Sequence, residues 1–208
     1  MHAHLRRYLF ETGAVLGTAS AAVLSDLLFG IHAYLVVPCM LAWVVYFALR
    51  VRRDASVLVE WGLRFDNLRS ASLQCAPILL LGAGGMLAYT FWRAERLEVA
   101  PSFVAVVVLY PIWGLAQQWL LQGVAVGNMR RLGAPPALIV LVVAALFGMA
   151  HAPDWRLAGL CAVAGAVWTA LYLRVPNIIP LGLCHGWLGA LAYYLVLGRD
   201  PLRAVWPG

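Results

Sequence analysis

The chain has 208 residues, of which 63% are hydrophobic and 12% charged, with a formal net charge of +6 and a mean hydropathy of +0.84. Soluble domains have about 45–50% apolar and about 25% charged residues, so the composition excludes a soluble globular protein, and so much apolar sequence also excludes a disordered one. All fifteen basic residues are arginines that lie mostly between apolar stretches. They form no basic patch with interleaved aromatics, so we expect no nucleic-acid partner.

Seven apolar stretches in chain order are candidates for membrane-spanning helices, since a span needs about 20 apolar residues. They are Leu9–Leu24, Leu27–Leu49, Ala71–Trp92, Ser102–Met129, Pro136–His151, Leu157–Leu173 and Ile178–Leu197. The first and fifth are short for a span. The predicted fold is all-α, a polytopic bundle of about seven transmembrane helices, with residues 1–208 forming a single membrane domain and the lipid bilayer as its surroundings.

The arginines orient this bundle. With the N-terminus inside, ten arginines fall in cytoplasmic segments and five on the opposite side, as the positive-inside rule requires. This topology places the C-terminus outside and the only long connection, residues 50–70, in the cytoplasm. Within that connection Trp61 and Phe65 lie four residues apart among charged side chains, which suits a short helix in the membrane interface.

Three stretches contain glycine pairs at four-residue spacing, which permits close contact between helices. The pairs are Gly13/Gly17, Gly123/Gly127 and Gly182/Gly186. We interpret these pairs primarily as contacts between helices of the same chain. Contact between two copies of the chain is the second interpretation.

Strongly polar residues gather in the later spans. Gln117, Gln118 and Gln122 lie in PIWGLAQQWLLQG, His151 ends FGMAH, and His185 lies in LGLCHGWLG. An unsatisfied polar group at membrane depth costs several kcal/mol. We therefore expect these side chains to converge from three helices on one polar cavity. With α-helical spacing Gln118 and Gln122 share a face, while Gln117 points about 100° away.

This ordered set of motifs resembles the CPBP family of CAAX proteases and bacteriocin-processing enzymes, also called the Abi family, over about residues 60–197. That family carries a Glu-Glu pair followed by Arg, a Phe with His four residues on, and a His with Asn four residues on. Phe147 and His151 match the second motif, and His185 keeps the histidine of the third. The segment WGLRFDNL at residues 61–68 also looks like the one that precedes the core in many members.

The resemblance implies a site within the membrane and a role for each motif residue. In the family the glutamate is taken to activate a water, while the histidines and the Asn bind it and stabilise the oxyanion. The candidate catalytic residues are His151, His185, Gln117 and Gln118. The candidate substrate-binding residues are Gln122, Phe147, Trp119 and Trp187.

Three departures from the family pattern affect the chemistry. The Glu-Glu pair reads Gln117-Gln118, the Arg position holds Gln122, and the Asn position holds Gly189. A carboxylate accepts a proton as a general base, whereas a neutral amide cannot do so near pH 7. We predict no metal site, because two histidines without a carboxylate leave a metal short of ligands, and the sequence does not identify a cofactor.

Three functions stay open from the sequence. The first is a CAAX-type hydrolase acting on an apolar peptide or prenylated substrate, with a histidine as the base. The second is a non-proteolytic descendant that binds a lipid, an isoprenoid or a partner helix. The third is an enzyme of different chemistry on an isoprenoid, in a cavity lined by aromatic rings. Asp154, three residues past His151, is one carboxylate that could reach the site. We expect a multi-pass protein of the bacterial inner (cytoplasmic) membrane.

Overall fold

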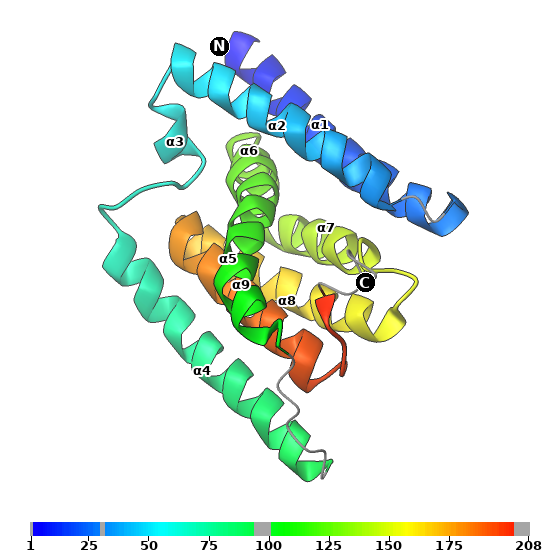
Figure 1. The fold of residues 1–208 in the computed structure, drawn as a ribbon. Coiled ribbons are helices and arrows are strands. Elements are labelled where there is room, and N and C mark those ends of the chain that lie inside the picture. Colours follow the sequence, from blue (N-terminus) through cyan, green and yellow to red (C-terminus); the bar gives the residue numbers. More distant parts are fainter. Residues whose placement is uncertain (1, 30–31, 94–100, 202–208) are drawn as a thin grey trace. The chain divides into compact units, whose positions relative to one another are not determined.

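The computed structural model describes residues 2–29, 32–93 and 101–201, which are helices joined by short connections (Figure 1). The chain divides into two compact units. The first comprises Met1–Arg64 and Trp119–Pro176, and the second comprises Phe65–Gln118 and Asn177–Gly208. Each unit is described by itself.

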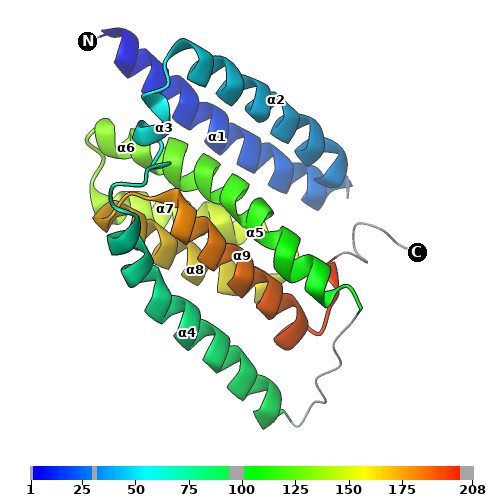
Figure 2. The same cartoon turned by 60° about the vertical axis from the view of Figure 1, so that its left-hand side comes forward.

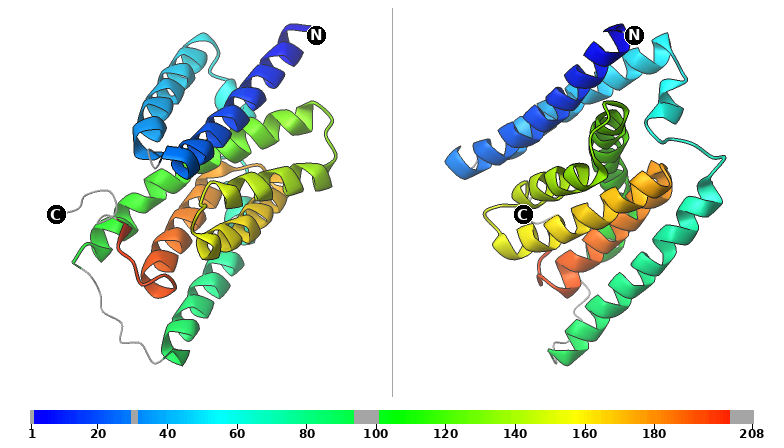
Figure 3. Two further views of the ribbon diagram at one scale, coloured as in Figure 1. Left: turned by 90° about the vertical axis from the view of Figure 1, so that its right-hand side faces the viewer. Right: turned by 180° about the vertical axis from the view of Figure 1, so that it is seen from behind.

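The first unit has seven helical elements among its described residues. They are α1 (His2–Phe29), α2 (His32–Arg53), α3 (Val57–Glu60), the π-helix η1 (Trp119–Val126), α6 (Gly127–Arg131), α7 (Pro136–Met149) and α8 (Trp155–Arg174). Helices α1 and α2 form a hairpin, and α7 and α8 lie side by side (Figure 3). A buried cluster that includes Val15, Phe47, Trp61 and Val124 joins α1, α2, the end of α3 and η1.

The second unit consists of α4 (Leu68–Trp92), α5 (Phe103–Gln118) and α9 (Ile178–Leu195). Helix α9 packs against both α4 and α5, and Figure 2 shows its close course beside α5. Glycines allow this approach: a Cβ added at Gly114 would lie 2.6 Å from the carbonyl oxygen of Gly182 and 2.8 Å from the nitrogen of Gly186. No side chain fits between the two backbones at this point.

The length and apolar character of the helices confirm the predicted polytopic bundle. Six helices in the described part of the chain are long and apolar enough to cross a membrane. They are His4–Phe29, Leu35–Arg53, Leu68–Trp92, Phe103–Arg131, Trp155–Arg174 and Ile178–Leu195. The fifth predicted stretch, Pro136–His151, forms the shorter apolar helix Pro136–Met149. The chain is therefore a multi-pass integral membrane protein.

The expected short helix through Trp61 and Phe65 is wrong. Helix α3 covers only Val57–Glu60, and Gly62 follows with a positive φ of 83°, which ends the helical course. Trp61 is fully buried with its ring 4.9 Å from that of Phe47, because burial of a large apolar ring stabilises the fold more than exposure at an interface. Phe65 is exposed. The cytoplasmic placement of residues 50–70 stays a prediction.

The glycine pairs divide into packed and open ones. Gly182 packs against Leu115, and Gly123 approaches the carbonyl oxygen of Trp61 so closely that an added Cβ would lie 2.5 Å away. Gly13 and Gly17 have no atom within 4 Å of an added Cβ. The expected packing within the chain is therefore wrong for this pair, because α1 turns it away from the buried face that carries Val15. Contact between copies of the chain at this pair stays a prediction.

Candidate functional site

In the second unit, Gln118 holds His185. Gln118 is fully buried at the end of α5, and its amide nitrogen lies 2.8 Å from Nδ1 of His185 on α9. The close α5–α9 packing at Gly114 brings the two helices within reach of this bond. The amide nitrogen donates, so Nδ1 accepts and the neutral imidazole carries its proton on Nε2. His185 thus presents an N–H donor on the far side of its ring.

In the first unit, His151 has the opposite tautomer. Its Nδ1 lies 2.7 Å from the backbone carbonyl oxygen of Phe147. A carbonyl oxygen only accepts hydrogen bonds, so Nδ1 carries a proton, and in the neutral imidazole Nε2 is then the unprotonated nitrogen. The ring of Phe147 meets the imidazole edge-on at a centroid distance of 5.1 Å. His151 therefore offers a proton acceptor of fixed orientation.

Helix α8 supports the end of α7 that carries this histidine. Gly165 on α8 lies against Phe147, where an added Cβ would come within 3.1 Å of the phenylalanine Cβ. Gly148 on α7 similarly lies against the backbone of Ala158. Asp154 begins α8 as its N-cap, and its Oδ1 accepts a hydrogen bond of 3.1 Å from the backbone nitrogen of Leu157. This carboxylate thus has a helix-capping role.

Gln122 is tied to α8 as well. Its Nε2 donates to the hydroxyl of Thr169 at 3.2 Å, and that hydroxyl donates to the carbonyl oxygen of Gly165 at 2.7 Å. Gln122 is fully buried, and its Oε1 has no hydrogen-bond partner among the described residues. The Oε1 of Gln118 is also buried without a hydrogen-bond partner among the described residues. Each amide therefore retains one buried acceptor.

The π-helical stretch changes the spacing assumed from the sequence. Gln118 ends an α-helix and bonds to α9, whereas Gln122 lies inside η1 and bonds to α8. A shared face at four-residue spacing assumes α-helical geometry, which the wider turns of η1 do not keep. Gln117 is half-buried and makes no side-chain hydrogen bond within the described residues.

The two candidate tryptophans have different surroundings. The ring of Trp119 stacks on Phe47 at a centroid distance of 4.5 Å and meets Trp61 edge-on at 5.7 Å, so it packs against the buried cluster of the first unit. Trp187 on α9 is exposed. His151 and His185 belong to different units, and their convergence on one cavity stays a prediction. Among the described residues, no three His, Cys, Asp or Glu side chains form a group able to hold a metal ion.

Comparison with known families gives a match over part of the chain. Residues 98–191 match the family model of Rce1-like proteins, described as type II CAAX prenyl endopeptidase Rce1-like. Over these residues the chain is similar to that family. This region includes every motif residue named above, from Gln117 in α5 to Gly189 in α9. No match appears among curated proteins or among solved structures.

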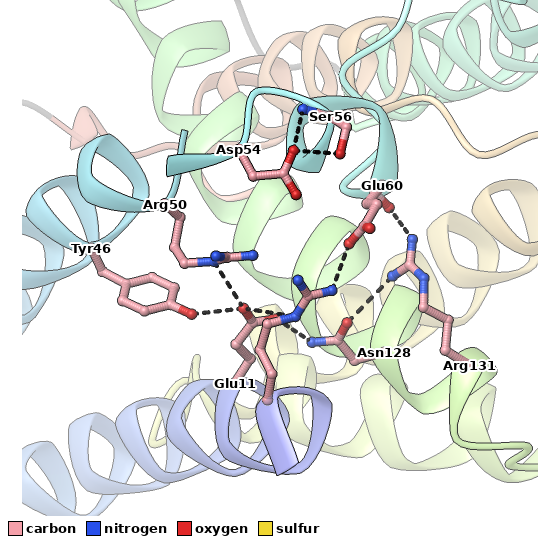
Figure 4. Close-up of polar contacts among 9 residues, drawn as sticks. Glu11, Tyr46, Arg50, Asp54, Ser56, Glu60, Asn128 and Arg131 are labelled. Atoms are coloured by element: carbon pink, nitrogen blue, oxygen red, sulfur yellow. Dashed lines mark hydrogen bonds and ion pairs between the residues drawn. The ribbon is translucent and has the colours of Figure 1, made fainter. Parts of the chain in front are cut away.

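Sequence reasoning missed a second polar cluster, which lies outside the matched CPBP region except for α6. Glu11 on α1 is buried, and its two oxygens accept hydrogen bonds from Tyr46 at 2.6 Å and from Asn128 at 2.7 Å (Figure 4). Arg7 and Arg50 each bring Nε to 3.9 Å from Oε1 of this carboxylate. The sequence feature that could have revealed this cluster is Glu11 itself, an acid inside an apolar stretch, four residues after Arg7.

Proposed function

We propose that this protein is a CAAX-type endopeptidase of the bacterial inner membrane in which His151 replaces the family's glutamate as the base. Its substrate would be a membrane-delivered apolar peptide or a prenylated chain. The observation that carries the proposal is the hydrogen bond from Nδ1 of His151 to the Phe147 carbonyl oxygen. This bond leaves the Nε2 lone pair of a neutral imidazole as a proton acceptor.

In the proposed reaction, Nε2 of His151 takes a proton from water, and the hydroxide oxygen attacks the carbonyl carbon of the scissile peptide bond. The protonated imidazole then gives this proton to the leaving nitrogen as the C–N bond breaks, so the histidine returns to its starting state. General acid–base assistance of this kind contributes about 10²–10⁴-fold. A histidine provides it at neutral pH, which neither Gln117 nor Gln118 can do.

His185 would stabilise the negative charge that develops on the carbonyl oxygen. The bond from Gln118 places the imidazole proton on Nε2, and an oriented N–H donor is the group that an oxyanion requires. In this proposal Gln117 and the unpartnered oxygen of Gln122 bind the substrate backbone or the water. Phe147, Trp119 and Trp187 provide apolar surface for the substrate. Action of both histidines on one bound substrate is part of the proposal.

A non-proteolytic role is the second candidate, in which the same region binds or transforms a lipid or an isoprenoid. It is favoured by the two carboxamide oxygens of Gln118 and Gln122, which are buried without partners in the described part of the chain. Such acceptors suit the hydroxyl or amide group of a ligand, because a buried acceptor left unpaired costs about 1–3 kcal/mol. No carboxylate at the family's glutamate positions is needed for binding.

Cleavage of a prenylated CAAX-type peptide by the purified chain tests the proposal. We expect turnover that is lost in His151→Gln and reduced in His185→Gln, with thermal unfolding used to verify that each variant folds. His4→Gln is the matched control, since His4 is an exposed histidine on α1 outside the matched region. Turnover that persists when both motif histidines are replaced would refute the proposal.

The double variant Gln117→Glu, Gln118→Glu separates the two candidate functions. If the site retains peptidase geometry, the restored acids supply the family's own carboxylate base, and turnover should be maintained or raised although the tautomer of His185 changes. Absence of turnover both in the natural chain and in the double variant favours the non-proteolytic role. Binding of an isoprenoid alcohol to the natural chain, measured by its effect on thermal unfolding, would then be the next measurement.

A further inference from the structure

Arg50 has a largely buried side chain with two guanidinium atoms that lack a hydrogen-bond partner among the described residues. It lies in the last turn of α2, and its side chain is only 17% exposed. Its Nε and Nη2 atoms are buried and without a hydrogen-bond partner in the described part of the chain. Buried donors are nearly always paired in native proteins. Two donors of Arg50 are therefore left for an acceptor other than the described residues.

The nearest carboxylate is already engaged. Glu11 lies 3.9 Å from Nε of Arg50, which is an ion pair but exceeds a hydrogen bond. Its Oε1 accepts from Tyr46 and its Oε2 from Asn128 (Figure 4). The guanidinium of Arg50 is thus attracted to the Glu11 carboxylate by charge. Both oxygens of that carboxylate, however, already accept a hydrogen bond from another residue.

Arg7 extends the same cluster. Its Nη2 donates to Glu60 at 2.8 Å, whereas its Nε is buried and unpartnered among the described residues. The side chain of Arg7 is 18% exposed. Glu11 lies 3.9 Å from an Nε atom of each of these two arginines, so both guanidinium groups are held close to one carboxylate. Two forked donors beside each other can share the oxygens of one tetrahedral anion.

The charge at this end of the first unit favours an anion. Hydrogen bonds from Arg7 and Arg131 to Glu60 bring the first turns of α1 and the last turn of α6 to the end of α3. The arginines of these turns and of the last turn of α2 outnumber the carboxylates Glu11, Asp54 and Glu60. They are Arg6, Arg7, Arg50, Arg52, Arg53, Arg130 and Arg131.

Exposed apolar residues precede Arg50 on α2. Leu49 and Val45, one helical turn apart, are 47% and 57% exposed. Helix α2 is long and apolar enough to span a membrane, and Arg50 lies within three residues of its end. At such a position an acyl chain lies against apolar side chains while its phosphate lies level with the arginine. Free inorganic phosphate offers the same oxygens but no acyl chain.

We propose that Arg50 and Arg7 bind the phosphate of an anionic phospholipid whose acyl chain lies along Leu49 and Val45 of α2. The site is separate from the motif residues and does not depend on the proposed peptidase activity. In this site the two guanidinium groups donate hydrogen bonds to the oxygens of the phosphodiester. The lipid is selected over free phosphate by the exposed apolar residues beside the arginines.

Lipid retention by the full chain in detergent tests this site. The probes are dioleoyl phosphatidylglycerol, dioleoyl phosphatidylcholine and inorganic phosphate, with native mass spectrometry for binding and thermal unfolding for stabilisation. We expect phosphatidylglycerol to bind about tenfold more tightly than phosphatidylcholine, in line with a charge-assisted hydrogen bond. Inorganic phosphate should give little stabilisation. Equal stabilisation by inorganic phosphate would overturn the assignment to a lipid.

Variants separate a specific site from general attraction to basic residues. Arg50→Gln should reduce phosphatidylglycerol binding about tenfold, whereas Arg53→Gln, at an exposed arginine of the same helical turn, should reduce it less than about threefold. Equal losses in both variants would overturn the proposal. Arg50→Lys keeps the charge beside Glu11 and serves if Arg50→Gln fails to fold. It should retain less phosphatidylglycerol than the natural chain, and equal retention would contradict a role for the guanidinium fork.

Discussion

The side-chain nitrogen of Gln118 lies 2.8 Å from Nδ1 of His185, so a motif position that is glutamate in CPBP enzymes still contacts a motif histidine in this chain. The bond differs in direction from the one a glutamate would make. An amide nitrogen donates to Nδ1, whereas a carboxylate accepts a proton from it. The exchange of Glu for Gln therefore changes which nitrogen of His185 carries the proton as well as the charge of the site.

Gln118→Glu should reverse the tautomer of His185. A carboxylate at this position accepts from Nδ1, which moves the imidazole proton from Nε2 to Nδ1. Nitrogen-15 NMR of histidine-labelled protein in micelles distinguishes the two tautomers. Gln117→Glu is the control, because Gln117 makes no hydrogen bond to His185. An Nδ1-protonated ring already present in the natural chain would contradict the assignment.

Thr169→Val should destabilise the protein by about 1 kcal/mol, because the buried Nε2 of Gln122 loses its acceptor while the shape of the side chain is preserved. Thr169→Ser retains the hydroxyl and should lose less. Unfolding in mixed micelles with increasing SDS measures both variants. A Thr169→Val variant as stable as the natural chain would show that Gln122 does not need this bond.

Gly114→Ala should cost about 1–3 kcal/mol, since its methyl group would overlap the backbone of Gly182 and Gly186 where α5 and α9 meet. Gly84→Ala on α4 is the matched control, because no atom lies within 4 Å of its added Cβ. That control should change stability by less than about 0.5 kcal/mol. Thermal unfolding of the two variants in one detergent gives the comparison, and equal stability would contradict the close helix contact.

Glu11→Gln should cost about 3 kcal/mol, because Arg7 and Arg50 lose their buried counter-charge and one donor, Tyr46 or Asn128, then faces an amide nitrogen. Glu60→Gln should cost less than about 1 kcal/mol, since its side chain is 31% exposed and the pair with Arg7 is screened by water. Chemical unfolding in micelles should separate the two variants clearly. Similar losses would argue against a central role for Glu11.

The loop after α2 provides a pH-dependent prediction. The hydroxyl and then the backbone N–H of Ser56 bond to Asp54 and hold the pKa of its carboxyl below the usual 3.8. A lowered folded-state pKa contributes stability above the unfolded pKa, and this contribution is lost as the pH falls through the folded value. Ser56→Ala should raise the pKa of Asp54 toward 3.8 in a carboxyl carbon-13 NMR titration. Ser70→Ala, at an exposed serine, should leave it unchanged.

Composition and local pattern were sufficient for the class of protein and for the order of its helices. Apolar stretches determine spans because the bilayer requires helices of a given length whatever their neighbours are. The fifth stretch was predicted from the same pattern, and its 14-residue helix α7 is shorter than a full span. The ordered motifs indicated the family region, which the match over residues 98–191 supports.

Hydrogen-bond partners that lie far apart in the sequence were identified only from the tertiary structure. Gln118 and His185 are 67 residues apart, and Asn128 and Glu11 are 117 residues apart. Neither pairing leaves a signal in local periodicity, because a hydrogen bond between helices depends on how closely their backbones approach. The same reason explains Trp61, whose charged neighbours in sequence suggested an interface while Phe47 and Trp119 surround it in space.

The sequence by itself determined that the chain is a polytopic helical membrane protein with two histidines and three glutamines in its later spans. The tertiary structure decided which groups meet Nδ1 of His151 and of His185, and that an arginine and a glutamate of the first two helices form a buried cluster with Asn128. The physical reason is the range of the forces involved. Burial of apolar surface follows the composition of each segment, whereas hydrogen bonds extend about 3 Å and exist only where packing brings donor and acceptor together.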